Sequence, residues 1–248
     1  LTVGAMVFCT ALRVYMISFQ CGTYSMMIDG RLCILTGHLQ VKQREYNTEP
    51  KMRYSVPDGV ALAAHLRRDA GLEHVAARAA AFAVASSDER SSGSQLLGVQ
   101  PERDAGVSTL PGLIGEGRYL QGNDAHEIVL GSVLARNLKL GIGDEITFLG
   151  TGRDGSFAAG IATVVGIIDS GAPDLDRAIA QVPLGNFQDA FARGGHVHSI
   201  VIKLPQLDMV QPVQTQLEGL VNDPELAVLD WDALQPGLRQ AIQADLFS

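Results

Sequence analysis

The sequence predicts an α+β fold in which two β-α-β halves flank an inserted, β-rich segment behind an apolar N-terminal run. Three observations support this fold class. An apolar run fills residues 1–28, strand-like and helix-like patterns alternate in two separate segments, and the residues between them are rich in glycine and short strand-like stretches. The expected divisions, in chain order, are 1–36, 37–100, 101–196, 197–231 and 232–248.

The N-terminal run is interpreted as a truncated transmembrane helix, already in progress at Leu1, with a stalk that ends at residue 36. Insertion values of about −0.3 to −0.6 kcal/mol per large apolar residue sum to roughly −4 kcal/mol, against roughly +3 kcal/mol for the central Arg13. We therefore expect preceding residues to complete the span, or a partner helix to pack against Arg13. A core helix and a secretory signal peptide are the alternatives, although no basic stretch or A-x-A-like cleavage site accompanies the run.

The composition is that of a folded protein and excludes several functional classes. The 248 residues carry a net charge of −8, with 46% apolar and 19% charged residues, so the chain can bury a substantial core. No basic cluster is denser than Arg67-Arg68, which argues against a nucleic-acid partner. The three cysteines, Cys9, Cys21 and Cys33, all precede the more polar main body of the chain, residues 37–248. That body therefore fits an oxidising compartment without depending on disulfides.

The first β-α-β half is expected to begin with a strand over 38–43. Asp58 is a typical N-cap residue for the helix that follows, and Gly71 is expected to end that helix. Alternating apolar residues then predict a β-hairpin. Its first strand, extended polar tip and second strand are expected at 74–85, 86–93 and 95–99.

The second half repeats this order near the C-terminus. A strand over 198–204 precedes apolar residues at helical spacing over 207–220, and a strand over 226–229 follows. Residues 232–248 have a helical pattern whose apolarity rises towards the end of the sequence. We interpret them as a stalk helix that leads to a second membrane span.

The inserted middle segment contains strand-like runs and a glycine-rich turn, at 127–130, 145–149, 159–168 and 152–155. Gly117 and Gly131 are expected at positions where a side chain would block a close approach. Asp144, which follows Gly143, is expected to accept hydrogen bonds from nearby backbone N–H groups in a turn. These roles are structural and need no ligand.

The chain lacks the motifs of the common enzyme classes. It has no G-x-S-x-G nucleophile elbow, no H-E-x-x-H zinc helix and no G-x-x-x-x-G-K-[ST] phosphate loop. Gly141-Ile142-Gly143 is not a dinucleotide fingerprint, because no third glycine follows. The sequence therefore predicts no catalytic, cofactor-binding or metal-binding residues. Any ATP that drives this protein is expected to bind another polypeptide or another region.

One alternative is a metal site in a membrane-anchored hydrolase. Its ligands would be His196, His198 and the acidic loop with Asp169, Asp174 and Asp176. The two histidines would share a strand face, and imidazole and carboxylate groups suit zinc. The competing interpretation is structural: the histidines are surface residues, and Asp174 and Asp176 cap or orient the segment that begins at Arg177. The structural interpretation is favoured.

A series of short motifs follows a fixed order along nearly the whole chain. They are Gly37-His38-Leu39-Gln40-Val41, Leu97-Gly98-Val99 with Pro101, Gly117-Arg118-Tyr119-Leu120, Ile128-Val129-Leu130-Gly131, Leu134-Ala135 with Leu138, Leu140 with Gly143-Asp144, Val165-Gly166-Ile167, and Leu175-Asp176. In this order they resemble the extracytoplasmic region of ABC transporter permeases of the MacB and LolC/LolE type, which are FtsX-like.

The resemblance implies a porter-like subdomain made by 37–100 and 197–231, with a Sabre-like subdomain inserted at 101–196. It implies a non-catalytic permease component in the cell inner membrane, with its main domain in the periplasm. The implied partners are a separate ATPase subunit, a second permease in a homo- or heterodimer, and a periplasmic lipoprotein carrier or adaptor protein. The implied cargo is hydrophobic, lipidated or peptidic.

Two functional classes follow, and transport is favoured over the hydrolase because the two membrane-directed ends agree with the resemblance. The transport hypothesis also predicts three further apolar spans after Ser248. Apolar loop residues that could touch cargo are Leu110, Leu113, Ile114 and Phe157, although single exposed apolar residues occur on any protein.

Overall fold

The computed structural model describes residues 35–49, 51–192 and 194–235. The expected membrane helix with Arg13, most of its stalk, and the expected helix beyond Gln235 lie outside the described residues. Among the residues that are described, no helix combines the length and the apolar character that crossing a bilayer requires.

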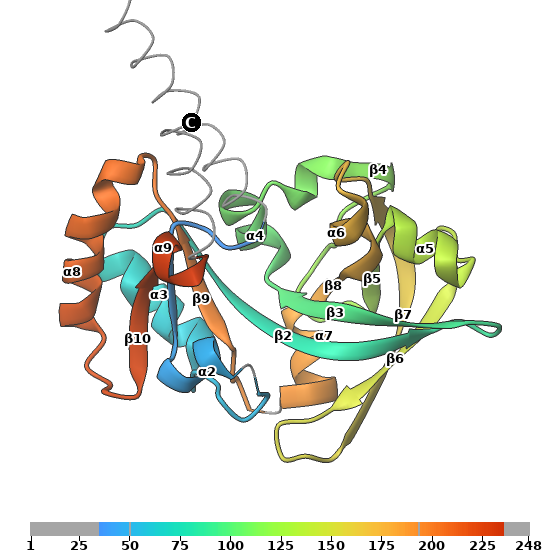
Figure 1. Ribbon diagram of the computed structural model, residues 1–248, viewed down its shortest axis with the longest axis horizontal. Helices are drawn as coiled ribbons and strands as arrows, with labels where there is room; N and C mark the ends of the chain where they lie inside the picture. The colour runs from blue at the N-terminus through green and yellow to red at the C-terminus, as the bar shows by residue number, and fades with distance from the viewer. Residues whose placement is uncertain (1–34, 50, 193, 236–248) are drawn as a thin grey trace, which may run out of the picture.

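A mixed sheet runs through the whole of the described structure, with helices packed on its faces (Figure 1). The strands pair in the order β10-β1-β9-β2-β3-β8-β5-β7-β4, and β6 pairs with both β2 and β7. The strands are β1 (Leu39–Gln43), β2 (His74–Ser86), β3 (Ser91–Val99), β4 (Ile114–Gly117), β5 (Glu127–Gly131), β6 (Glu145–Thr151), β7 (Phe157–Ile168), β8 (Ile179–Pro183), β9 (Ser199–Lys203) and β10 (Leu226–Asp230).

The α-helices are α2 (Arg44–Thr48), α3 (Gly59–Asp69), α4 (Pro101–Val107), α5 (Ser132–Leu138), α6 (Pro173–Ala178), α7 (Leu184–Phe187), α8 (Val210–Leu220) and α9 (Trp231–Leu234). Single 3₁₀ turns cover Leu110–Leu113 and Leu207–Met209, and a π-helical turn covers Gln188–Ala192. The α+β fold class is therefore confirmed.

The strands that the alternation of apolar residues predicts are present, but the hairpin differs. Strands β2 and β3 continue into residues 86–93, which were expected to form the polar tip. Only residues 87–90 form a loop, which is closed by a hydrogen bond from Ser87 N to Arg90 O (2.8 Å). The extended tip is therefore wrong. Strand β8 was not predicted, because all of its residues are buried and its sequence does not alternate.

Six of the strands close into a barrel, at the right of Figure 1. The ring runs β2-β3-β8-β5-β7-β6 and returns to β2. Closure pairs the long edges that an open sheet would expose. Inside the barrel, Phe148 lies against Gly160 on the neighbouring strand, where an added Cβ would lie 2.2 Å from the phenyl ring. The missing side chain therefore makes room for the ring.

The other lobe, at the left of Figure 1, is a sheet in the order β10-β1-β9-β2. Helices α3 and α8 cover one of its faces. Leu39 of β1 and Ile200 of β9 belong to the same core cluster as Leu66 of α3 and Leu217 of α8. Because side chains alternate along a strand, the neighbouring residues point to the opposite face.

Strand β2 belongs to both lobes. Residues 74–78 pair with β9, and residues 78–86 pair with β3. Alanine is frequent in this strand although it is a weak strand former. The residues 75–79 are buried without interruption, so small side chains suit its two covered faces. The division after residue 100 stays a prediction, and β3, which it assigns to the first half, lies in the barrel.

The glycine and aspartate roles in the middle segment are confirmed. Gly117 has φ +77°, and a Cβ there would lie 2.3 Å from the carbonyl oxygen of Val165. The Oδ2 atom of Asp144 accepts a hydrogen bond from Gly141 N (2.7 Å). Gly117 therefore lets the end of β4 approach β7 closely, and Asp144 holds the turn that precedes β6.

The ends of α3 only partly follow the prediction. Asp58 occupies the N-cap position, but its backbone is left-handed (φ 45°) and its side chain makes no capping hydrogen bond. The side-chain role predicted for Asp58 is therefore wrong. At the other end, Gly71 has φ +64°, and Leu72 N donates to the carbonyl oxygen of Arg67 (3.1 Å). This is the arrangement of a Schellman motif, so the stop at Gly71 is confirmed.

Replacing Gly131 by Ala should destabilise the domain by about 1–3 kcal/mol, because overpacking carries that cost and the added Cβ would lie 2.2 Å from the backbone oxygen of Asp176. Urea denaturation followed by the fluorescence of Trp231, the only tryptophan, measures the change. Gly219→Ala is the matched control. It adds a methyl group to α8 in open space and should stabilise by about 0.5–1 kcal/mol. Equal free energies of unfolding for both variants would contradict the packing.

Candidate functional site

His198, one of the histidines considered for a metal site, is a buried structural residue. Its side chain is 2% exposed. Its Nδ1 accepts a hydrogen bond from Ala80 N (3.0 Å), so Nε2 carries the proton, and Nε2 lies 3.4 Å from the carbonyl oxygen of Met52. Burial lowers the pKa of His198 to about 4. The imidazole is therefore neutral at pH 7, and both nitrogens face backbone partners.

His196 lies between the two lobes. Its Nδ1 is 3.2 Å from Ser55 Oγ, and its Nε2 is 2.8 Å from Nη1 of Arg153. Because a guanidinium can only donate, Nε2 must accept, and Nδ1 then carries the proton and donates to Ser55. Burial, and then the charge of Arg153, lowers the pKa of His196. We name this contact the interlobe latch (Ser55, His196 and Arg153).

Asp176, one of the carboxylates considered for the metal site, holds the turn before α6. Asp176 is buried, and its Oδ1 accepts from Ser170 Oγ (2.6 Å) and from Ser170 N (3.2 Å). Asp174 lies in the first turn of α6. Asp176 thus accepts hydrogen bonds from Ser170, a residue before the helix. The expectation that it caps or orients the segment that begins at Arg177 is therefore wrong. Within 35–49, 51–192 and 194–235, no group of three or more His, Cys, Asp or Glu side chains could hold a metal ion.

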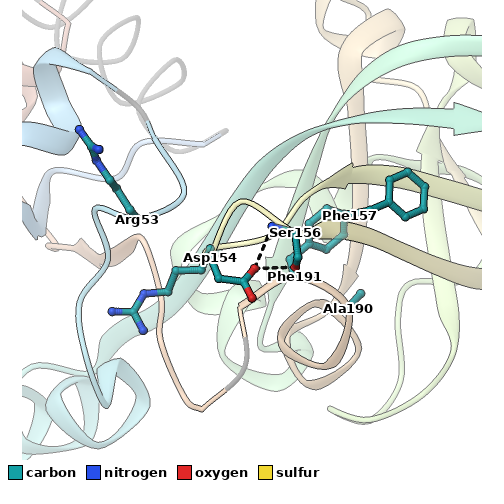
Figure 2. A pocket seen from close by; sticks show the side chains of 7 residues that line it. Arg53, Asp154, Ser156, Phe157, Ala190 and Phe191 are labelled. Carbon is teal, nitrogen blue, oxygen red and sulfur yellow. Dashed lines mark hydrogen bonds between the residues drawn. The ribbon is translucent and has the colours of Figure 1, made fainter.

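A cavity of about 410 Å³ lies between the lobes, beside the interlobe latch. Figure 2 shows Arg53 on the loop of one lobe and Asp154 and Ser156 on the β6–β7 turn of the other. The carboxylate of Asp154 shapes that turn, because its Oδ1 accepts from Ser156 N (3.0 Å). Phe191 lines the floor and stacks on Phe187, with 5.0 Å between the ring centroids. The cavity therefore has a charged rim and an aromatic floor.

The outside of the barrel carries an exposed apolar face. We define the outer apolar face by Phe82 and Val84 of β2 and Phe157 and Ile161 of β7. Phe82 and Phe157 are each 76% exposed, and Ile161 is 59% exposed. The strand registers pair Val84 with Leu149 of β6, and Leu149 with Ala159 of β7. Ala159 lies midway between Phe157 and Ile161, so its side chain points to the same face as theirs. These side chains therefore share one face, and exposed apolar clusters mark contact surfaces.

Of the four loop residues considered for cargo, Phe157 is the one on this face. Leu110 is fully buried, so it is unavailable and that expectation is wrong. Leu113 and Ile114 are partly buried and pack against the second core cluster of the barrel. The sequence pattern did not separate these cases, because all four are apolar residues within two positions of a glycine or proline.

A buried polar network lies where the two lobes meet. Arg78 of β2 is 4% exposed and Asp104 of α4 is fully buried. The Nε of Arg78 donates to Asp104 Oδ1 (2.7 Å), and its Nη1 donates to the carbonyl oxygen of Leu35 (2.5 Å). The hydroxyl of Tyr119 donates to Asp104 Oδ2 (3.1 Å) and lies 3.1 Å from the amide oxygen of Gln181. Burial, and then the carboxylate of Asp104, raises the pKa of Tyr119.

The sequence interpretation missed this network. Its available signal was Arg78 itself, a single charge in an otherwise alanine-rich strand, because a charge in a buried strand requires a partner. The identity of the partner was not readable, since Asp104 lies on a different element. The interlobe latch was also missed, as Ser55 and Arg153 are far from His196 in the sequence.

The two ends of the described structure lie side by side. The side-chain Nε2 of Gln235, after α9, donates to Thr36 Oγ1 (3.3 Å). Thr36 precedes β1, which pairs with β10 along its whole length. The chain therefore enters and leaves this domain at one place.

Residues 1–220 match the family model of the MacB-like periplasmic core domain. The periplasmic region of MacB from Actinobacillus actinomycetemcomitans is similar in structure, with a TM-score of 0.58 and 13% identity over 85% of this chain and 94% of that one. The extracellular domain of the noncanonic ABC-type transporter YknZ from Gram-positive bacteria has a TM-score of 0.56 and 15% identity over 79% of this chain and 100% of that one. At these identities the two structures show a shared fold. No curated protein sequence matches this chain significantly.

Removing one partner of the buried Arg78–Asp104 pair should be far more costly than removing both. Arg78→Met or Asp104→Leu alone should lower the free energy of unfolding by about 3–5 kcal/mol, because a buried charge loses its partner. The double variant Arg78→Met with Asp104→Leu should recover much of this loss. Urea denaturation of all four proteins forms a double-mutant cycle. Additive losses would show that the two side chains do not interact.

The stability of the domain should fall as the pH drops from about 6.5 towards 4. His198 has its pKa lowered to about 4 in the folded state, from 6.5, so in this window the unfolded chain takes up a proton that the folded chain does not. The loss from this residue should be about 2 kcal/mol at pH 5 relative to pH 7.5. His198→Gln should be less stable at pH 7.5 but lose less on acidification. The same pH dependence in both proteins would refute the buried neutral state.

Proposed function

The chain belongs to the family of MacB-like periplasmic core domains, and from that membership we propose a specific role in transport. The role is that of the extracytoplasmic domain of an ABC transporter permease. In this proposal it couples ATP hydrolysis by a separate ATPase subunit to the export or release of a hydrophobic, lipidated or peptide cargo. The permease itself is non-catalytic and works in the cell inner membrane.

The observation that carries the proposal is the meeting of the two ends at Thr36 and Gln235. A domain inserted between two membrane helices must receive and return the chain on its membrane side. The network at Arg78 lies at the same place, because it binds the carbonyl oxygen of Leu35. A displacement of the incoming segment would therefore reach β2 directly, and β2 extends into both lobes.

The two lobes and the surfaces between them supply the parts that such a domain needs. The interlobe cavity can change shape when the lobes move, because its walls come from both of them. The outer apolar face is the candidate surface for an apolar cargo, a lipoprotein carrier or an adaptor protein. A second permease, identical or related, completes the proposed assembly. The porter-like and Sabre-like subdomains at the expected divisions remain part of this proposal.

Single cysteines can test both the location and the coupling in the complete transporter. With Cys9, Cys21 and Cys33 replaced by Ser, Ser156→Cys places a thiol in the interlobe cavity. Glu89→Cys is the matched control at the hairpin loop, where the side chain is 69% exposed. Both should react with a membrane-impermeant maleimide in intact cells. Trapping ADP on the ATPase subunit with vanadate should change the reaction rate of Ser156→Cys alone, because the lobes move relative to each other.

Two results would contradict the proposal. If both thiols react only after the cells are broken open, the domain is not extracytoplasmic. If both react from outside, but nucleotide trapping changes neither rate, the domain does not respond to the ATPase.

A further inference from the structure

A second cavity lies on the face of the four-stranded sheet that α3 and α8 leave uncovered. Its volume is about 320 Å³, within the range of small-ligand sites. Gln40 and Lys42 of β1 point into it, whereas Leu39 and Val41 point to the core below. Leu35 and Thr36 line its edge, at the place where the chain enters the domain. We name this cavity the sheet pocket.

The sheet pocket contains one cation, Lys42, that no carboxylate of the described residues pairs with. Lys42 and Arg78 are its charged residues, and no Asp or Glu lines it. Arg78 is neutralised by Asp104. Among the described residues, no carboxylate lies within ion-pair distance of Lys42 Nζ, and the nearest aromatic partner is the ring of Tyr46, 5.6 Å away. An uncompensated cation here contrasts with the net charge of −8 for the whole chain.

The ionisation states of the pocket suit an anion. Burial lowers the pKa of Lys42 to about 8, so the ammonium is still the major form at neutral pH. Burial also raises the pKa of Tyr46 to about 12, so its phenol stays neutral and can donate. A partly buried ammonium without a counter-charge costs free energy. A bound anion would remove that cost.

Gln40 adds a requirement for a hydrogen-bond donor. Its side chain is 4% exposed, and its Nε2 donates to the carbonyl oxygen of Thr36 (2.5 Å). That bond determines which way the amide points, because a carbonyl oxygen can only accept. The Oε1 atom is then buried without a partner. A buried acceptor of this kind is costly unless a donor reaches it.

We propose that the sheet pocket is a binding site for a hydroxyl-bearing anion of the glycerol phosphate type. Lys42 pairs with the phosphate, and Gln40 Oε1 accepts a hydrogen bond from the hydroxyl group. Leu97 and Val201 line the same cavity and supply an apolar wall for the adjoining carbon atoms. The chemistry is shared by the headgroup of phosphatidylglycerol and by free glycerol 3-phosphate. This site is independent of the transport proposal, because it requires neither cargo movement nor an ATPase.

Two binding measurements on the purified full chain separate these sources. Isothermal titration calorimetry tests free glycerol 3-phosphate, and native mass spectrometry from nanodiscs compares phosphatidylglycerol with phosphatidylcholine of the same acyl chains. Lys42→Met should weaken binding roughly tenfold or more, because a charge-assisted contact is lost. Gln40→Leu should reduce the preference for glycerol 3-phosphate over inorganic phosphate. Lys139→Met is the matched control, since it removes the same charge from an exposed site paired with Glu89.

Each outcome decides the proposal. Binding of phosphatidylglycerol alone assigns the site to a lipid headgroup, and binding of glycerol 3-phosphate in solution assigns it to a free anion. Binding of neither, equal binding of both lipids, or equal weakening by Lys42→Met and Lys139→Met would overturn it. Lys42→Met should fold, because Met replaces a partly buried ammonium that has no counter-charge among the described residues. Its thermal unfolding confirms this before the affinities are compared.

Discussion

The buried guanidinium of Arg78 is the constraint on which both lobes depend. Arg78 is the residue at which β2 changes partners, because it pairs with Ser199 of β9 on one side and with Val99 of β3 on the other. A charge at this depth is tolerated only when its donors are satisfied. Asp104 and the carbonyl oxygen of Leu35 must therefore lie where they do. One side chain thus positions the first helix after the hairpin and the segment that leads into β1.

A second line of contacts joins the lobes through aromatic rings. Phe148 inside the barrel stacks near Phe191 (5.8 Å between centroids), and Phe191 stacks on Phe187 (5.0 Å). Phe187 meets the edge of His198 (6.4 Å), and His198 lies 5.1 Å from Tyr46 of α2. His198 can hold this place only while it is neutral, since a charged imidazole would be buried among apolar rings. The aromatic contacts therefore connect the barrel interior with the lining of the sheet pocket.

The elements that the sequence predicts well are those whose pattern is local. Strands whose apolar residues alternate, such as β1 and β7, were readable, whereas β8 is buried throughout and its sequence has no period. The turn at Gly131 was readable because glycine marks close approach. The contacts of the site residues could not be predicted. Arg78 meets Asp104, and His196 meets Arg153, only after the sheet has closed. Pairing between distant residues leaves no trace in a single sequence without an alignment.

The two contacts between the lobes differ in strength, and the difference determines what can move. In Figure 1, the start of β1 and α9 lie in the upper part, whereas the β6–β7 turn and the loop before α3 lie in the lower part. The upper contact is the buried ion pair of Arg78, whose disruption costs about 3–5 kcal/mol. The lower contact is the interlobe latch. It consists of a hydrogen bond between the neutral side chains of His196 and Ser55, which contributes about 0.5–1.5 kcal/mol, and a hydrogen bond from Arg153 that is exposed to solvent. We therefore expect the lobes to separate at the cavity and to pivot about β2 near Arg78. Protonation of His196 would favour the same opening, because Nε2 could no longer accept from Arg153 and two cations would face each other.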